Sequence, residues 1–100
     1  MSDYSQAIRF DDGHPALPGH FPGLPLVPGV LMLEQVALAL RAWRGQRLSR
    51  VIEAKFMVPL LPDESAQLQL SGAAADTSRI GFSIKRDGMV LARGIVEGTA

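Results

Sequence analysis

The sequence predicts an α+β fold in which an antiparallel β-sheet wraps around one long central helix. Two patterns predict it. Residues 29–44 form an almost uninterrupted apolar run with helix boundaries, and the segments after it alternate in the manner of β-strands. Turn sequences separate those segments, which is typical of antiparallel strands. With 100 residues, the chain is expected to form a single domain over residues 1–100.

The helix is expected to begin after Pro28 and to end before Gly45. Proline suits the first position of a helix, and glycine commonly follows the last turn. The helix is apolar on nearly all sides until Arg41, so we expect it to be buried. Before it, residues 11–29 hold five prolines, which exclude a helix or a central strand and favour an ordered loop.

Strands are expected both before and after this helix in the sequence. The expected segments are residues 4–10 before the loop, and 50–59, 65–75, 80–84 and 89–96 after the helix. Asp87-Gly88 indicates a tight hairpin before the last strand. We expect the strands to form a meander. Pairing of a free sheet edge with a second subunit would cover part of a chain that is 47% hydrophobic.

The composition excludes several classes of protein. Ten basic and ten acidic residues give no net charge, which argues against a nucleic-acid binder. The chain has no cysteine, so disulfides, thiolate metal sites and thiol nucleophiles are excluded. No apolar stretch is long enough to span a membrane, and no signal peptide is recognisable, so we expect a cytoplasmic protein.

Glu34 is the first candidate catalytic residue, because it is the only acidic residue between Asp12 and Glu53 and lies within the apolar helix. A carboxylic acid in apolar surroundings is harder to ionise, which makes it useful as a proton donor near neutral pH. The alternative is that Glu34 only interacts with the helix dipole or faces solvent beside Gln35. The helix pattern does not decide between these interpretations.

His20 is the second candidate and lies in the sequence Gly19-His-Phe-Pro-Gly23. Histidine can accept a proton in one step and return it in another near neutral pH, and the flanking proline and glycine would fix its direction. A lone loop histidine is more often inert. His14 is interpreted in that way, because no acid is placed to pair with it.

The start of the helix is the third candidate. The first N–H groups of a helix have no acceptor within the helix and carry partial positive charge. Those of Gly29 and Val30 could therefore hold the oxygen of a thioester carbonyl as negative charge develops on it. An ordinary helix start is the alternative interpretation.

The run from Gly19 to Ala37, GHFPGLPLVPGVLMLEQVA, resembles the signature of the bacterial FabA/FabZ-type 3-hydroxyacyl-acyl carrier protein dehydratases. That signature has a histidine in HFPG, then PxxPGV, then an acid in the following helix. The matching positions here are His20, Pro25, Pro28, Gly29, Val30 and Glu34. Glutamate as the acid is similar to the FabZ branch. A looser resemblance runs from Ala54 to Asp63, where the glycine of the family's PGD motif is absent.

The resemblance implies a hotdog fold and a hydro-lyase of fatty acid or related lipid biosynthesis. His20 would act as the base at C2 of the substrate, and Glu34 of the partner subunit would protonate the hydroxyl that leaves C3. The backbone of Gly29, with Val30, would hold the thioester oxygen. Phe21, Val30, Leu33 and Phe56 would line the acyl-binding site. The resemblance implies no metal or redox cofactor.

The same resemblance implies two kinds of partner. One is a second subunit, as a homodimer, with a higher oligomer or a heterodimer as alternatives. The other is an acyl carrier protein, whose acidic surface would dock on a basic patch among Arg41, Arg44, Arg47, Arg50 and Lys55. The nineteen residues before His20 are fewer than is usual in the family, which leaves the acyl chain length open and favours the compact dehydratases of accessory lipid or aryl-polyene pathways.

Two other functions stay open at this stage. A hotdog thioesterase would use an acid on the same helix to activate water, although such enzymes generally lack the HFPG sequence around His20. A non-catalytic acyl-binding subunit of a biosynthetic complex would keep the fold without turnover. The presence of both His20 and Glu34 argues against that second alternative.

Overall fold

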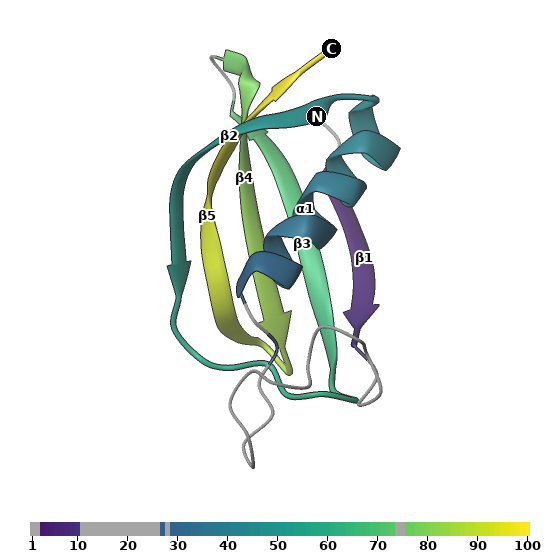
Figure 1. Cartoon of the computed structure of the whole chain (residues 1–100), viewed down its shortest axis with the longest axis vertical. Coiled ribbons are helices and arrows are strands. Elements are labelled where there is room, and N and C mark those ends of the chain that lie inside the picture. The colour runs from purple at the N-terminus through teal and green to yellow at the C-terminus, as the bar shows by residue number, and fades with distance from the viewer. Residues whose placement is uncertain (1–2, 11–26, 28, 74–75) are drawn as a thin grey trace.

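The computed structural model describes residues 3–10, 27, 29–73 and 76–100 (Figure 1). Its elements are β1 (Tyr4–Arg9), α1 (Gly29–Arg44), β2 (Arg47–Phe56), β3 (Ser65–Ala73), β4 (Asp76–Arg86) and β5 (Met89–Thr99). The α+β prediction is confirmed, and the helix has the bounds expected from the sequence. Each expected strand is present, although β2 begins earlier and β4 and β5 are longer than expected.

The strands form one antiparallel sheet in the order β1-β3-β4-β5-β2. The predicted meander is therefore right for β3, β4 and β5 but wrong for β2, which pairs with β5 and lies at the opposite edge from β1. Residues 57–64 carry the chain from one side of the sheet to the other, past the start of α1 (Figure 1). The alternation of apolar and polar residues within a strand reveals its two faces but does not reveal which strands pair with it.

The sheet curls because β2 is bulged against β5. The register shifts between Leu48 and Arg50 and again between Val51 and Glu53. Each bulge bends the strand and increases its twist, which brings β2 around the side of the helix. Gly94 of β5 lies beneath the second bulge, where the backbone of Glu53 leaves no room for a side chain.

The Asp87-Gly88 hairpin is present as expected. Both residues have positive φ, 51° and 82°, as a two-residue turn with the twist of the flanking strands requires. Gly88 adopts this conformation without steric cost, and aspartate tolerates it better than most residues.

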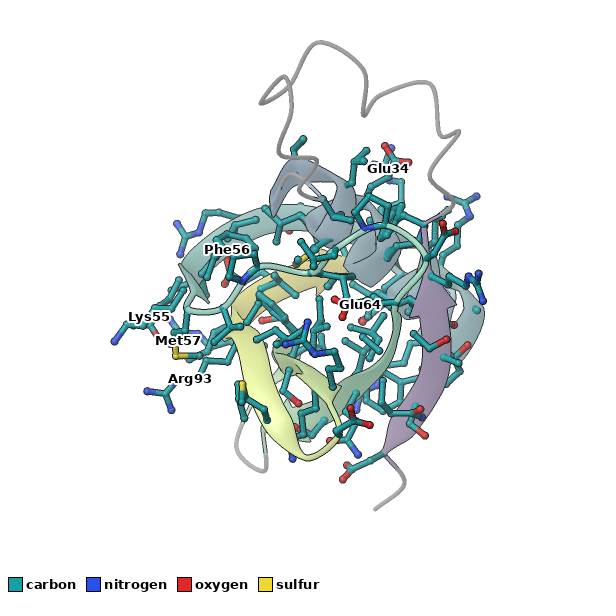
Figure 2. The ribbon with its side chains drawn as sticks, turned by 90° about the horizontal axis from the view of Figure 1, so that it is seen from below. Glu34, Lys55, Phe56, Met57, Glu64 and Arg93 are labelled. Carbon is teal, nitrogen blue, oxygen red and sulfur yellow. The ribbon has the colours of Figure 1, made fainter. Side chains whose placement is uncertain are left out.

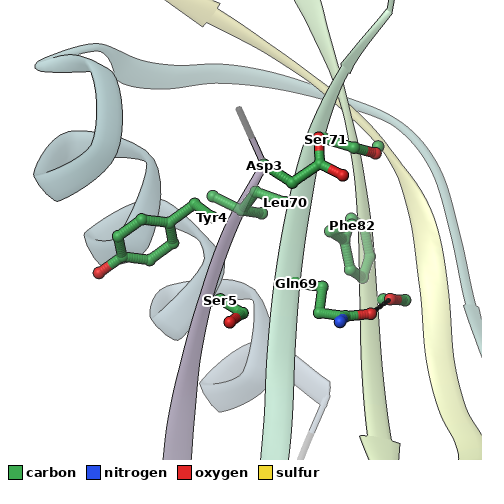
Figure 3. A pocket seen from close by; sticks show the side chains of 9 residues that line it. Asp3, Tyr4, Ser5, Gln69, Leu70, Ser71 and Phe82 are labelled. Atoms are coloured by element: carbon green, nitrogen blue, oxygen red, sulfur yellow. Dashed lines mark hydrogen bonds between the residues drawn. The ribbon is translucent and has the colours of Figure 1, made fainter. Parts of the chain in front are cut away.

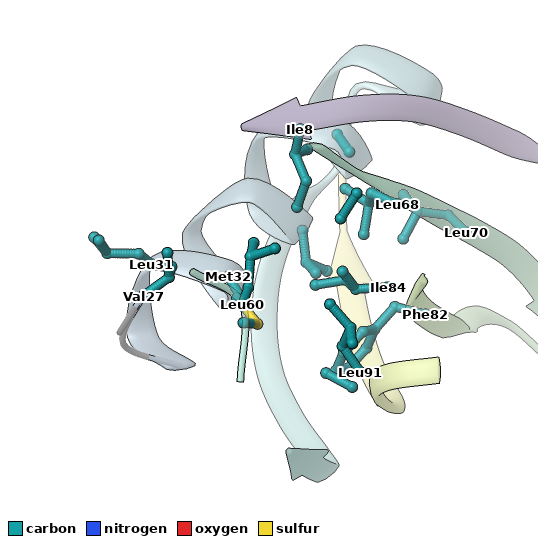
Figure 4. Packing of buried hydrophobic residues seen from close by; sticks show 14 of the residues in the cluster. Ile8, Val27, Leu31, Met32, Leu60, Leu68, Leu70, Phe82, Ile84 and Leu91 are labelled. Carbon is teal, nitrogen blue, oxygen red and sulfur yellow. The ribbon is translucent and has the colours of Figure 1, made fainter. Parts of the chain in front are cut away.

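The core lies between the concave face of the sheet and one face of α1 (Figure 4). Leu68 and Leu70 of β3 and Ile80 and Ile84 of β4 are fully buried, and they alternate with exposed or half-buried residues. The buried helix residues are Leu31, Met32, Val36, Ala39 and Leu40, which recur with the helical period. No helix in the described part of the chain is long and apolar enough to cross a membrane.

The expectation that α1 is buried on nearly all sides is wrong for the described residues. Val30 is 67% exposed, Leu38 is 56% exposed, and Glu34 lies exposed between them at helical spacing. A sheet of this width covers one face of a helix, so the opposite face needs a cover from elsewhere. We refer to Val30, Glu34 and Leu38 as the exposed helix stripe.

Substitution of Gly94 by alanine should destabilise the fold. An added Cβ would collide with the carbonyl oxygen of Glu53 and would lie 2.6 Å from Cε2 of Phe82. Overpacking of this kind costs roughly 1–3 kcal/mol or more in the free energy of unfolding, which chemical denaturation can measure. Gly81→Ala in β4 is the control, because its Cβ would lie 3.3 Å from the Ser71 hydroxyl and 3.8 Å from the Ser71 carbonyl oxygen, with no backbone atom in collision. Equal stabilities of the two variants would contradict this account of the bulge.

Candidate active site

The structure describes most of the residues expected at the active site. His20 and Phe21 lie outside the described residues. Gly29, Val30, Leu33, Glu34 and Phe56 are described, and they come from α1 and the end of β2.

Gly29 and Phe56 are in direct contact at the start of α1. A Cβ placed on Gly29 would lie 3.0 Å from Cζ of Phe56, so the aromatic ring rests against the helix backbone itself. Phe56 is the last residue of β2, and its side chain is 47% exposed. The ring therefore provides an open apolar surface beside the first N–H groups of the helix, which lack intrahelical acceptors.

Glu34 lies about 7.5 Å along the helix axis from Gly29, at 1.5 Å per residue. Its side chain is exposed (Figure 2), so of the two interpretations left open by the sequence, the described residues agree with a Glu34 that faces solvent. The physical reason is the rotation of the helix. Val36 and Leu40 face the sheet and are completely buried, which turns Glu34 outward with Val30 and Leu38.

The residues expected to line an acyl-binding site differ in their exposure. Val30 is open to solvent, whereas Leu33 is partly buried and packs against the core cluster. Gly29 lies next to Val30 in the sequence and contacts the Phe56 ring. These three residues therefore lie together at the start of the helix. Met57, the next residue after Phe56, is 48% exposed.

Residues 57–64, which we call the crossing segment, contact this part of the structure and were not among the expected site residues. The Leu60 carbonyl accepts a hydrogen bond from Val27 N at 2.9 Å, and Asp63 N donates to the Phe10 carbonyl at 2.7 Å. The residues that flank the segment 11–26 are thus both bonded to the crossing segment. In the sequence, this segment is marked only by the looser resemblance from Ala54 to Asp63 and by the turn expected between two strands.

The basic residues expected to form a docking patch do not form one group. The Arg44 guanidinium lies 4.1 Å from the centroid of the Trp43 ring, and Arg50 pairs with Glu97 at 2.9 Å. Arg41 and Arg47 are exposed near the other end of the helix.

Lys55 instead lies directly opposite Arg93 in the β2–β5 pairing. Both side chains are exposed, and neither has a carboxylate partner among the described residues. Figure 2 shows Lys55, Met57 and Arg93 together on one side of the molecule. Like charges directly opposite each other destabilise a strand pair unless an anion neutralises them.

A cavity of about 310 Å³ lies elsewhere, over β1, β3 and β4 (Figure 3). Its polar lining includes Ser5, Gln69, Ser71 and Ser83; Gln69 and Ser83 alternate with buried residues and so face away from α1. Gly81 deepens it by the absence of a side chain. Of the expected site residues that the structure describes, none lines this cavity, so it is separate from the surface around Gly29 and Phe56.

Comparison with known proteins finds a family and solved structures that are similar to this chain over nearly all of its length. The model of the ApeI-like family, described as ApeI dehydratase, matches residues 2–95. Among solved structures, the dehydratase heterocomplex ApeI:P from Xenorhabdus doucetiae has a TM-score of 0.85 at 22% identity, covering 98% of this chain and 88% of that one. An uncharacterized protein from Erwinia carotovora subsp. atroseptica has a TM-score of 0.81 at 25% identity, covering 97% and 82%.

Curated relatives match over a shorter range. The 3-hydroxyacyl-[acyl-carrier-protein] dehydratase FabZ of Haemophilus influenzae (strain Rd) is 36% identical over 66 residues, which are 56% of this chain and 45% of that protein. The enzyme of the same name from Myxococcus xanthus is 37% identical over 67 residues, with 56% and 44% covered. The chain therefore spans somewhat less than half of the curated relatives it matches.

The structural matches confirm the hotdog fold, in which one helix is wrapped by an antiparallel sheet. The family match and the FabZ relatives confirm the resemblance to FabA/FabZ-type dehydratases that the residues from Gly19 to Ala37 indicate. The chain belongs to the ApeI-like dehydratase family.

Proposed function

We propose that this protein dehydrates a 3-hydroxyacyl thioester, carried on an acyl carrier protein, to the trans-2-enoyl thioester. The observation that carries the proposal is the arrangement on α1. The helix starts at Gly29 against the Phe56 ring, and an exposed carboxylate, Glu34, follows on the same helix. The HFPG sequence with His20 precedes that helix, and the family match supports the same chemistry.

In the proposed mechanism, His20 removes a proton from C2 of the substrate, and the electron pair of that C–H bond becomes the new C2–C3 double bond. Glu34, in its acid form, donates a proton to the hydroxyl group at C3, which leaves as water. Negative charge that develops on the thioester oxygen is stabilised by the N–H groups of Gly29 and Val30. Return of the proton from His20 to Glu34 restores the starting state.

We propose further that each site uses two subunits. The exposed helix stripe leaves Glu34 without the apolar surroundings that favour a proton donor, and a second subunit over Val30 and Leu38 would supply them. The longer edge strand, β2, has 10 residues and exposes Val51, whereas β1 has 6. Pairing of β2 with a second copy would bury an otherwise open edge.

A related subunit in place of the second copy is the alternative, because one solved relative, ApeI:P from Xenorhabdus doucetiae, is a dehydratase heterocomplex.

The nearest rival function is thioester hydrolysis by a hotdog thioesterase. A crotonyl thioester separates the two activities, because hydration consumes the double bond and leaves the thioester intact, whereas hydrolysis releases free thiol. The same assay tests the non-catalytic acyl-binding subunit, for which neither product would form. Release of thiol faster than hydration would contradict the proposed function.

His20→Ala and Glu34→Ala should each abolish most of the dehydration without unfolding the protein. A group that transfers a proton in the transition state contributes roughly 10²–10⁴-fold to the rate, so kcat should fall by about that factor. Because Glu34 is exposed, its loss leaves no cavity in the core. Initial rates of enoyl thioester formation, with circular dichroism as a check of folding, measure both effects.

His14→Ala and Glu53→Ala are the matched controls for these two variants, because each removes the same kind of side chain outside the proposed site. Both should keep the rate of the unmodified protein. Near-normal turnover by both His20→Ala and Glu34→Ala would refute the assignment of the base and the acid.

We propose that the acidic carrier docks on Lys55 and Arg93. Both residues are exposed, and Lys55 lies in the sequence directly before Phe56, whose ring contacts Gly29. The prosthetic arm of a carrier protein bound there would begin close to the first residues of α1. This site replaces the patch expected from the arginines of the helix end, where Arg44 stacks on Trp43 and Arg50 is paired.

Reversal of both charges, Lys55→Glu with Arg93→Glu, should raise KM for a carrier-bound substrate by at least tenfold and leave kcat within about twofold. The same variant should process an N-acetylcysteamine thioester, which has no carrier, at the normal rate. Arg41→Glu with Arg47→Glu is the control with equal charge change. An equal rise in KM for both substrates, or for both double variants, would contradict docking at Lys55 and Arg93.

A further inference from the structure

Glu64, the last residue of the crossing segment, forms a partly buried ion pair with Arg86 of β4. Glu64 Oε1 accepts a hydrogen bond from Arg86 Nη1 at 2.6 Å, and the two side chains are only 34% and 24% exposed. The Arg9–Asp63 pair nearby is longer, at 3.4 Å, and about half exposed. Exposed pairs contribute little to stability, whereas a short, sheltered, charge-assisted bond can hold a definite geometry.

Both members of this pair also bind backbone atoms of the crossing segment. The same carboxylate oxygen of Glu64 accepts a hydrogen bond from Leu61 N at 3.0 Å. Arg86 Nη1 lies 3.4 Å from the carbonyl oxygen of Pro59, to which it donates. Leu60 is the residue between these two anchored positions, and its side chain is completely buried. The pair therefore fixes the backbone on both sides of Leu60.

Leu60 in turn holds the chain just before the helix. Its carbonyl oxygen accepts the hydrogen bond from Val27 N, and Val27 is itself 5% exposed. Only residue 28 separates Val27 from Gly29, the first residue of α1. Leu60 is thus linked to the start of the helix by one hydrogen bond and two peptide bonds.

We propose that Glu64 and Arg86 are positioning residues of the active site, which act through Leu60 and Val27 on the N–H groups at the start of α1. The inference rests on the proposed dehydratase function. An oxyanion donor works only at its correct distance, and a misplacement of 1 Å can cost about 100-fold in rate. The hydrogen bonds of Glu64 and Arg86 described above go to each other, to Leu61 and to Pro59, so the effect on Gly29 is indirect.

Glu64→Gln tests this role, because the amide oxygen can still accept from Leu61 N while the charge that holds Arg86 is lost. We expect kcat to fall by at least tenfold and KM for the carrier-bound substrate to stay within about threefold. Arg86→Lys, which keeps the positive charge but loses the guanidinium geometry, should give a smaller fall in kcat. Glu97→Gln is the matched control, since it breaks the Arg50–Glu97 pair at the other end of the sheet.

Hydrogen exchange of the Val27 amide gives a second measurement that does not depend on catalysis. Exchange should be faster in Glu64→Gln than in the unmodified protein and unchanged in Glu97→Gln, at equal global stability by chemical denaturation. Faster exchange together with a lower kcat would support the positioning role.

Two results would overturn the inference: unchanged Val27 exchange in Glu64→Gln, or faster exchange with an unchanged kcat. If the unmodified protein forms no enoyl thioester, the proposed function fails, and the exchange comparison still decides whether Glu64 holds Val27.

Discussion

The packing of α1 against the concave side of the curled sheet is the contact on which the site depends. Val36 and Leu40 are completely buried on the sheet side, and this fixes the rotation of the helix. Once that rotation is fixed, the opposite face carries Val30, Glu34 and Leu38 outward. The same contact thus stabilises the fold and places the proposed acid on a face that one subunit leaves open.

The bulged edge strand adds the second part of the site. Two register shifts in β2 bend it around the helix, and its last residue, Phe56, reaches the backbone of Gly29. The absence of a side chain at Gly29 allows this contact, because a Cβ would press on the ring. The contact of the Phe56 ring with the helix start and the position of Lys55 opposite Arg93 therefore both depend on this bent strand.

The sequence predicted the elements better than their arrangement. Proline and glycine mark the ends of the helix, and alternating apolar residues mark the strands, so local patterns were sufficient for both. The position of β2 beside β5 was missed, because it depends on the path of residues 57–64 across the sheet. The exposure of Glu34 was left undecided for a related reason, since an apolar helix sequence does not reveal how much of the helix one sheet can cover. His20 lies outside the described residues, and its role stays a prediction.

The central claim is that one subunit supplies His20 and the other supplies Glu34, and mixing two inactive variants tests it most directly. If the site is shared, each heterodimer of His20→Ala with Glu34→Ala contains one intact site and one doubly defective site. Random exchange of subunits, followed by sedimentation to verify a dimer, should then restore about a quarter of the activity of the unmodified protein. Recovery of no activity in a mixture shown to contain heterodimers would contradict the shared site.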